Sequence, residues 1–286
     1  MEQDIHQITY EDFPLPLKEI ADPPKTLYVR GHADVLFDPS VKKLAIVGSR
    51  KCSAYGADVV QYLVSGLKGH PICIISGLAL GIDALAHEAA LEYGLCTVSV
   101  PGSGIAHSVL YPKTNVNLAE RILAEGGCLL NEFSPTQTAT KWTFPKRNRL
   151  IAGLADAVLI IEAAEQSGTL ITARLASEYN RDLFVVPASI FAKSSRGAHQ
   201  FLKLGAIPVT TPEDILDHFD LMKTSQHPQR TLSPPEREIV TILATPTPRE
   251  EVIEALSMSI SEAETLLSKL ELDGIIKERL GKLYVQ

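Results

Sequence analysis

The sequence predicts an α/β protein whose open, mostly parallel, doubly wound sheet is followed by a small C-terminal domain. From residue 44 onward, short apolar runs alternate with helix-length amphipathic segments, as in parallel sheets with crossover helices. The apolar runs lack period-two alternation, which indicates strands buried on both faces. A polar stretch at 222–232, followed by Ser233-Pro-Pro235, then precedes a segment with a different pattern, so we expect a linker at 222–232.

Each apolar run is assigned to one strand. The expected strands are 44–47, 72–75, 96–100, 128–130, 157–161, 183–186 and a short 207–209. The helix-length segments between them are 56–68, 82–93, 115–126, 168–179 and 196–204, and Pro212 begins a last helix. This order is typical of a Rossmann-like domain, which we assign to residues 41–221.

The two ends of the chain differ from this central domain. Residues 1–40 are acidic and proline-rich with little periodicity, so we expect a short lead-in that packs on the main domain. Residues 233–286 show three helical segments, 235–244, 249–256 and 261–273, and then two short strands around Gly281. This pattern predicts a winged-helix domain. Its third helix begins among acidic residues, where a DNA-reading helix would carry cations, so we expect the domain to contact protein or to mediate assembly.

Composition places the chain among ordinary globular proteins. Hydrophobic residues make up 45% and charged residues 21% of its 286 positions, which is usual for such proteins. No apolar run approaches the roughly 20 residues that span a bilayer, and the N-terminus lacks the features of a signal peptide. The four cysteines are widely spaced without a C-x-x-C pair, which favours reduced thiols over a disulfide or a metal site. We therefore expect a cytoplasmic protein.

The net charge of −7 is unevenly distributed. Residues 1–40 hold eight acidic and three basic residues, whereas residues 41–231 hold 16 acidic and 18 basic ones. Within the centre, 141–149 carries four cations and 189–205 carries three, and neither segment contains an acid. Because a polyanion responds to local potential more than to total charge, these segments are candidates for binding one.

The strongest candidate site consists of two blocks on either side of the strand 157–161. The first block comprises Phe144, Lys146, Arg147, Asn148 and Arg149. The second comprises Ser167, Gly168 and Thr169 at the start of a helix. Cations beside a helix N-terminus favour phosphate groups. Ligands of open parallel sheets lie beyond the carboxyl ends of the strands, so the site is expected to include further residues there: Gly48, Ser49, Arg50, Ser76 and Gly77.

The same loops show little that indicates catalysis. There is neither a G-x-G-x-x-G sequence nor a P-loop, and no nucleophile–base pair assembles, so we expect no catalytic residue and no cofactor. We expect Glu162 to hold Arg147 or Arg149 in place, and Asp83 to accept backbone hydrogen bonds at a helix start. His87 shares the helical face of Asp83, but no third ligand indicates a metal. The alternative is an enzyme that acts on a nucleotide or nucleoside monophosphate, with Glu162 or Asp83 as its acid or base.

Several motifs occur in an order that resembles one known family. They are Gly48-Ser-Arg50, Ser76–Asp83 with His87, Tyr111-Pro112, Phe144–Arg149 and Ser167–Ala173. Together they are similar to the DNA-processing protein A (DprA/Smf) family over about residues 1–220, and the C-terminal winged helix resembles a domain that many members carry. The resemblance implies a non-enzymatic protein that binds single-stranded DNA, forms a homodimer and loads RecA recombinase during natural transformation.

The resemblance also implies roles for individual residues. The phosphate contacts would be made by Arg50, Lys146, Arg147 and Arg149, and Phe144 would stack on a base. The pocket would be lined by Gly48, Ser49, Ser76, Gly77 and 167–169, and the dimer contacts would lie within 200–220, with Phe201 and Leu202 as candidates. The sequence departs from the family pattern at Leu80, where the family usually has Arg, and at Ala188 and His199.

Overall fold

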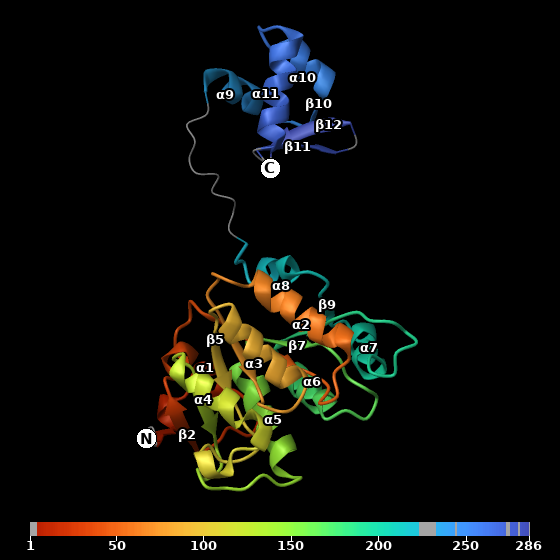
Figure 1. Ribbon diagram of the computed structural model, residues 1–286. Helices are drawn as coiled ribbons and strands as arrows, with labels where there is room; N and C mark the ends of the chain where they lie inside the picture. Colours follow the sequence, from red (N-terminus) through yellow and green to blue (C-terminus); the bar gives the residue numbers. More distant parts are fainter. Residues whose placement is uncertain (1–4, 223–232, 244, 273–274, 280, 286) are drawn as a thin grey trace. The chain divides into compact units, whose positions relative to one another are not determined.

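The computed structural model describes residues 5–222, 233–243, 245–272, 275–279 and 281–285. The chain divides into two compact units, Met1–Leu221 and Met222–Gln286, which we describe separately. The main unit is built on one nine-stranded sheet, and the second is a small domain of three helices and three short strands (Figure 1).

The main sheet has the order β1-β2-β6-β5-β4-β3-β7-β8-β9. Its strands are β1 (Ile5–Thr9), β2 (Thr26–Gly31), β3 (Lys42–Val47), β4 (Ile72–Ser76), β5 (Cys96–Ser99), β6 (Cys128–Asn131), β7 (Ala157–Ile160), β8 (Asp182–Val185) and β9 (Ile207–Pro208). The strands from β6 to β9 in this order are parallel. The predicted mostly parallel α/β sheet is therefore confirmed, including all seven predicted strands.

Strands β1 and β2 lie within the predicted lead-in and were not predicted. They pair antiparallel with each other, and β2 pairs antiparallel with β6. One reason that β2 escaped notice is Arg30, a charged residue in an otherwise apolar run. Its side chain is 4% exposed and its two terminal nitrogens donate to the Glu120 carboxylate at 3.0 and 3.1 Å. This buried charge is satisfied by a partner 90 residues away, which no local pattern reveals.

Helices cover both faces of the sheet (Figure 1). One face carries α2 (Ala54–Gly66), α3 (Ile82–Glu92), α4 (Val116–Ala124) and α8 (Pro212–His218); the other carries α1 (Leu15–Lys18), α5 (Thr143–Leu154), α6 (Thr169–Glu178) and α7 (Arg196–Lys203). Single 3-10 turns occur at Tyr10–Asp12, Asp34–Leu36, His107–Val109 and Lys113–Asn115. Along β3, Ala45 and Val47 enter one core whereas Leu44 and Ile46 enter the other, which explains the uninterrupted apolar run.

Helix α5 was not predicted, because its sequence was interpreted as a basic block at a strand end. It contains Pro145, which is tolerated because the first turn of a helix needs no backbone donor there. From Arg147 to Leu154 every residue is buried, so the polar and apolar positions do not alternate with a helical period. Because the helix is buried on all sides, its sequence lacks the amphipathic pattern from which a helix is predicted.

The second unit has the predicted winged-helix elements. They are α9 (Pro234–Ile242), β10 (Thr247–Pro248), α10 (Arg249–Ala255), α11 (Ile260–Leu272), β11 (Ile276–Arg279) and β12 (Lys282–Val285), and only β10 was not predicted. The three strands pair in the order β10-β12-β11. Their core includes Ile239, Val252, Leu267 and Leu283. Of the predicted linker, residues 223–232 lie outside the described residues.

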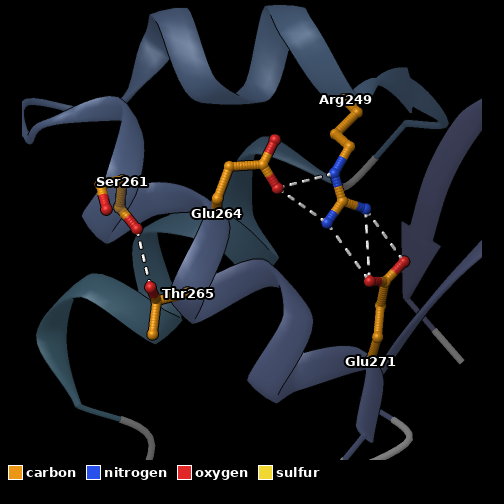
Figure 2. Close-up of polar contacts among 5 residues, drawn as sticks. All are labelled: Arg249, Ser261, Glu264, Thr265 and Glu271. Carbon is orange, nitrogen blue, oxygen red and sulfur yellow. Dashed lines mark hydrogen bonds and ion pairs between the residues drawn. The ribbon is translucent and has the colours of Figure 1, made fainter.

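Acidic side chains of α11 engage the first residue of α10 (Figure 2). The guanidinium of Arg249 lies 3.1 Å from a carboxylate oxygen of Glu264 and 3.1 Å from one of Glu271. On the same helix, the Thr265 hydroxyl donates to the Ser261 carbonyl at 2.7 Å. Glu264, one of the acids near the start that make this helix unlike a DNA-reading helix, and Glu271 near its end thus fix α10 against α11. That the domain contacts protein stays a prediction.

Among the described residues, no helix has the length and apolar character needed to cross a membrane. All four cysteines are free thiols, with Cys73 and Cys128 buried.

Candidate functional site

A pocket of about 530 Å³ lies at the carboxyl ends of β3 and β7. Strands β3 and β7 are neighbours in the sheet. From β3 the sheet continues through β4, β5 and β6, and from β7 it continues in the opposite direction through β8 and β9. This is the switch point where open α/β sheets bind ligands. The loops after the two strands and the N-terminal half of α5 line the pocket.

Most of the predicted site residues meet in this pocket. Its lining includes Gly48, Ser49, Arg50, Phe144, Arg147, Asn148, Ser167, Gly168 and Thr169. It also includes Lys51 and Gln166, which were not predicted. The signal for Lys51 was present, since a second cation directly follows Arg50 in the same loop.

The start of α6 forms one wall of the pocket. The Ser167 hydroxyl oxygen accepts from the Thr169 backbone amide at 3.2 Å, and the Thr169 hydroxyl donates to the Gly48 carbonyl at 3.0 Å. The second bond ties the loop after β7 to the loop after β3. A helix N-terminus held in this way favours an anion, because its first amides lack partners within the helix and the helix dipole is positive there.

Arg50 is the exposed cation of the pocket that lies over an aromatic ring. Its guanidinium carbon lies 4.5 Å from the centroid of Phe144, a cation–π distance. Within the described part of the chain, Arg50 has no hydrogen bond or ion pair. The Phe144 ring also packs against Gly102, where an added Cβ would lie 2.3 Å from Cε1. The guanidinium of Arg50 is therefore free to face a ligand, whereas the ring beneath it is partly covered.

Arg147 lies in the floor of the pocket rather than on its surface. Its side chain is 3% exposed, and it donates to the carbonyls of Gly77, at 2.6 Å, and of Val100. A Cβ at position 77 would lie 2.2 Å from Nη1 of Arg147, so a side chain there would displace the Arg147 guanidinium. Because Nε and Nη1 donate within the protein, to Asn148 and to these two carbonyls, Arg147 supplies the pocket with positive potential more than with direct contacts.

Three buried ionisable groups surround this floor. Burial lowers the pKa of Arg147 to about 10, although Asp83 opposes the shift, so the guanidinium stays protonated at neutral pH. Burial raises the pKa of Asp83, while Arg147 and the backbone amides of Ala79 and Gly77 oppose this. Burial, followed by the charge of Arg147, lowers the pKa of His87 to about 3. Asp83 lies in the first turn of α3, near the backbone amides of Ala79 and Gly77, and its role at the helix start stays a prediction.

Four of the predicted site residues do not line the pocket. Arg149 is buried, with Nη2 2.5 Å from the Glu132 carboxylate and Nη1 donating to the Asp22 carbonyl at 2.5 Å. The Lys146 ammonium lies 3.5 Å from the same Glu132. Successive residues of a helix are rotated by about 100° about its axis. Lys146 and Arg149 therefore lie on a different side of α5 from Arg147. Ser76 is buried, and its hydroxyl donates to the Ile46 carbonyl at 2.6 Å. Gly77 packs against the Arg147 guanidinium.

Glu162 was predicted to hold Arg147 or Arg149 in place, and the structure shows that this partner was wrong. Its carboxylate accepts from the Ser53 hydroxyl at 2.6 Å, the Ser53 amide at 3.0 Å and the Ser194 hydroxyl at 3.2 Å. It therefore supports the N-cap of α2 and does not hold Arg147 or Arg149. Glu132, which directly follows β6 and lies 17 residues before Arg149, holds Arg149 instead.

Comparison with known proteins assigns the family. Residues 4–220 match the model for DNA recombination-mediator protein A, and residues 223–282 match the DprA winged helix domain. The chain belongs to the DNA recombination-mediator protein A (DprA) family. The resemblance inferred from the ordered motifs is thus confirmed.

Two relatives in this family align with different shares of the chain. The DNA processing protein DprA of Streptococcus pneumoniae is 42% identical over 208 residues, which are 73% of this chain and 71% of that protein. Protein Smf of Escherichia coli is 36% identical over 290 residues, covering 96% of this chain and 76% of that protein.

Solved DprA structures share the fold. The X-ray structure of the Streptococcus pneumoniae protein aligns with a TM-score of 0.69 at 40% identity, over 76% of this chain and 75% of that one. DNA processing protein A of Helicobacter pylori, studied for its single-stranded DNA binding mode, aligns with a TM-score of 0.66 at 30% identity, over 77% and 98%.

Proposed function

We propose that this DprA-family chain is a recombination mediator that binds single-stranded DNA in the pocket between β3 and β7. The observation that carries the proposal is the exposed guanidinium of Arg50 over Phe144, beside the N-terminus of α6. A single strand offers phosphates to Arg50 and to the start of α6, and a base to the face of the Arg50 guanidinium. The single-stranded DNA binding of the Helicobacter pylori relative supports this assignment.

The residues divide into two groups in this proposal. Arg50 and Lys51 contact phosphates at the rim, and Ser167 and Thr169 shape the helix start that receives another anionic oxygen. Arg147 acts from below through its charge. The only carboxylate among the lining residues is Asp83, which is buried and engaged with Arg147 and backbone amides; this supports a binding role without catalysis.

The direct test is fluorescence anisotropy of a labelled oligonucleotide, single-stranded beside duplex, across a salt series. We expect preference for the single strand and an affinity that falls by about 0.7 log units per log unit of salt for each phosphate contacted. No binding at low salt, combined with a rise in melting temperature on adding AMP, GMP or NAD, would favour a nucleotide-binding enzyme instead.

Arg50→Ala is expected to weaken binding of all single-stranded sequences and to reduce the salt slope by about 0.7. The matched control is Arg121→Ala, an exposed arginine in the last turn of α4, which leads into the opposite end of the sheet. Equal affinity of Arg50→Ala and the wild type would remove Arg50 from the site.

We further propose that the bound strand is passed to RecA recombinase in the cytoplasm, as natural transformation requires. Family membership supports this step. It is tested by the rate at which RecA forms filaments on single-stranded DNA with wild-type chain and with Arg50→Ala. An equal rate with and without the wild-type chain would exclude loading.

A homodimer through residues 200–220 is also proposed, with one change to its expected residues. Phe201 is 7% exposed and belongs to the main core, whereas Leu204 is 81% exposed just after α7. Leu204 therefore replaces Phe201 as the candidate contact. Light scattering at tens of micromolar should show a dimer for the wild type and a monomer for Leu204→Asp. A wild-type monomer contradicts the homodimer, and a dimeric variant places the contact elsewhere.

A further inference from the structure

The chain contains a single tryptophan, Trp142, and its side chain is exposed. Its exposed fraction is 56%, although tryptophan is usually largely buried. A lone exposed apolar residue needs no explanation, but this one stands between Lys141 and the exposed Lys146. Aromatic side chains interspersed with cations are typical of surfaces that bind single-stranded nucleic acid.

The indole of Trp142 is held in a fixed position. It meets the Phe133 ring edge to face, with centroids 5.6 Å apart and planes at 88°. Phe133 is itself 6% exposed, and the Lys146 ammonium lies 5.7 Å from its centroid. Trp142 therefore rests on a buried ring and still leaves more than half of its surface to solvent.

This surface adjoins the pocket through helix α5. Trp142 is the N-cap of α5, and Lys146 lies one turn further on the same side. Pro145, about 60° around the helix from Trp142, lines the pocket, as do Phe144 and Arg147 on the far side of the helix. A strand that leaves the pocket across the N-terminal turn of α5 thus meets Trp142 next.

The one acid at this surface is largely neutralised. The side chain of Glu132 is 11% exposed, and its Oε2 lies 2.5 Å from the Arg149 guanidinium and 3.5 Å from the Lys146 ammonium. Its charge is satisfied mainly by a buried partner, and both Lys141 and Lys146 are exposed residues of the segment that carries Trp142. The potential at the indole therefore favours a phosphate backbone.

We infer that Trp142 is a second base-stacking position outside the pocket, with Lys141 and Lys146 beside the adjoining phosphates. The inference rests on the proposed function, because it extends the path of a strand that the pocket already holds. It requires that strands long enough to reach both positions bind more tightly than strands that only fill the pocket.

Because Trp142 is the only tryptophan, its intrinsic fluorescence reports on this position alone. We expect a long oligothymidylate to quench it and a short one, limited to the pocket, to leave it nearly unchanged. Trp142→Leu, which keeps an apolar contact with Phe133, should bind the long strand roughly 5- to 150-fold more weakly, the effect of one lost base stack. Trp142→Phe should retain most of the affinity.

Tyr62→Leu is the matched control, because Tyr62 is a 52% exposed aromatic on α2 that does not line the pocket. Urea unfolding of Trp142→Leu checks that the fold is kept. If the long strand binds without quenching, or if Trp142→Leu weakens short and long strands equally, the second position is wrong and the proposed function stands. If neither length binds the wild type, the proposed function fails and the inference fails with it.

Discussion

Replacing Arg147 by alanine is expected to lower the free energy of unfolding by several kcal/mol, at about 1–3 kcal/mol for each buried carbonyl that loses its donor. The variant leaves the carbonyls of Gly77 and Val100 without their donor. It also leaves Asp83 buried without the cation that favours its ionised form. Urea unfolding followed by circular dichroism measures the loss.

Two variants separate this structural role from DNA contact. Arg50→Ala should unfold like the wild type, because Arg50 is exposed and lies only over Phe144. Adding Asp83→Asn to Arg147→Ala should restore part of the stability, because it removes the uncompensated carboxylate. An Arg147→Ala protein with wild-type stability but with the DNA affinity of Arg50→Ala would instead make Arg147 a direct ligand contact.

The parts of the fold that sequence could predict are those with local patterns. The seven parallel strands are apolar on both faces, as Leu44 to Val47 illustrate, so each appears as an uninterrupted run. Strand β2 and helix α5 were missed because they bury charges such as Arg30 and Arg149, whose partners Glu120 and Glu132 come from elsewhere in the chain. Long-range ion pairs therefore set the limit of prediction.

The candidate site divides in the same way. Its loops could be located because parallel strands bring their carboxyl ends to one edge, and the pocket lining includes Gly48 to Arg50 and Ser167 to Thr169. The direction of each side chain on α5 could not be predicted while that segment was interpreted as a strand-end block. Its helical turn places Arg147 in the pocket floor but sends Lys146 and Arg149 to Glu132.

His87 is expected to make the fold sensitive to acid. It is fully buried, and its Nδ1 lies 2.7 Å from the Thr97 hydroxyl oxygen. That hydroxyl donates to the Ile74 carbonyl at 2.9 Å, so its oxygen accepts a hydrogen bond from Nδ1–H of neutral His87. Burial and Arg147 lower the pKa of the folded state from 6.5 to about 3. Between these values the unfolded chain binds a proton that the folded chain does not, so stability falls as pH falls.

The expected contribution to the loss is about 2 kcal/mol by pH 5 and about 4 kcal/mol by pH 3, at about 1.36 kcal/mol per unit of pKa shift. The contribution of His87 is isolated by comparing urea unfolding of the wild type and His87→Gln from pH 7 to 4, because the carboxyl groups titrate in both proteins. Asp83, with its raised pKa, has the opposite sign, because its folded form takes up a proton first. His6→Gln, at an exposed position on β1, should keep the wild-type slope. If His87→Gln keeps it as well, His87 is protonated in the folded state near its ordinary pKa, and the buried neutral imidazole is wrong.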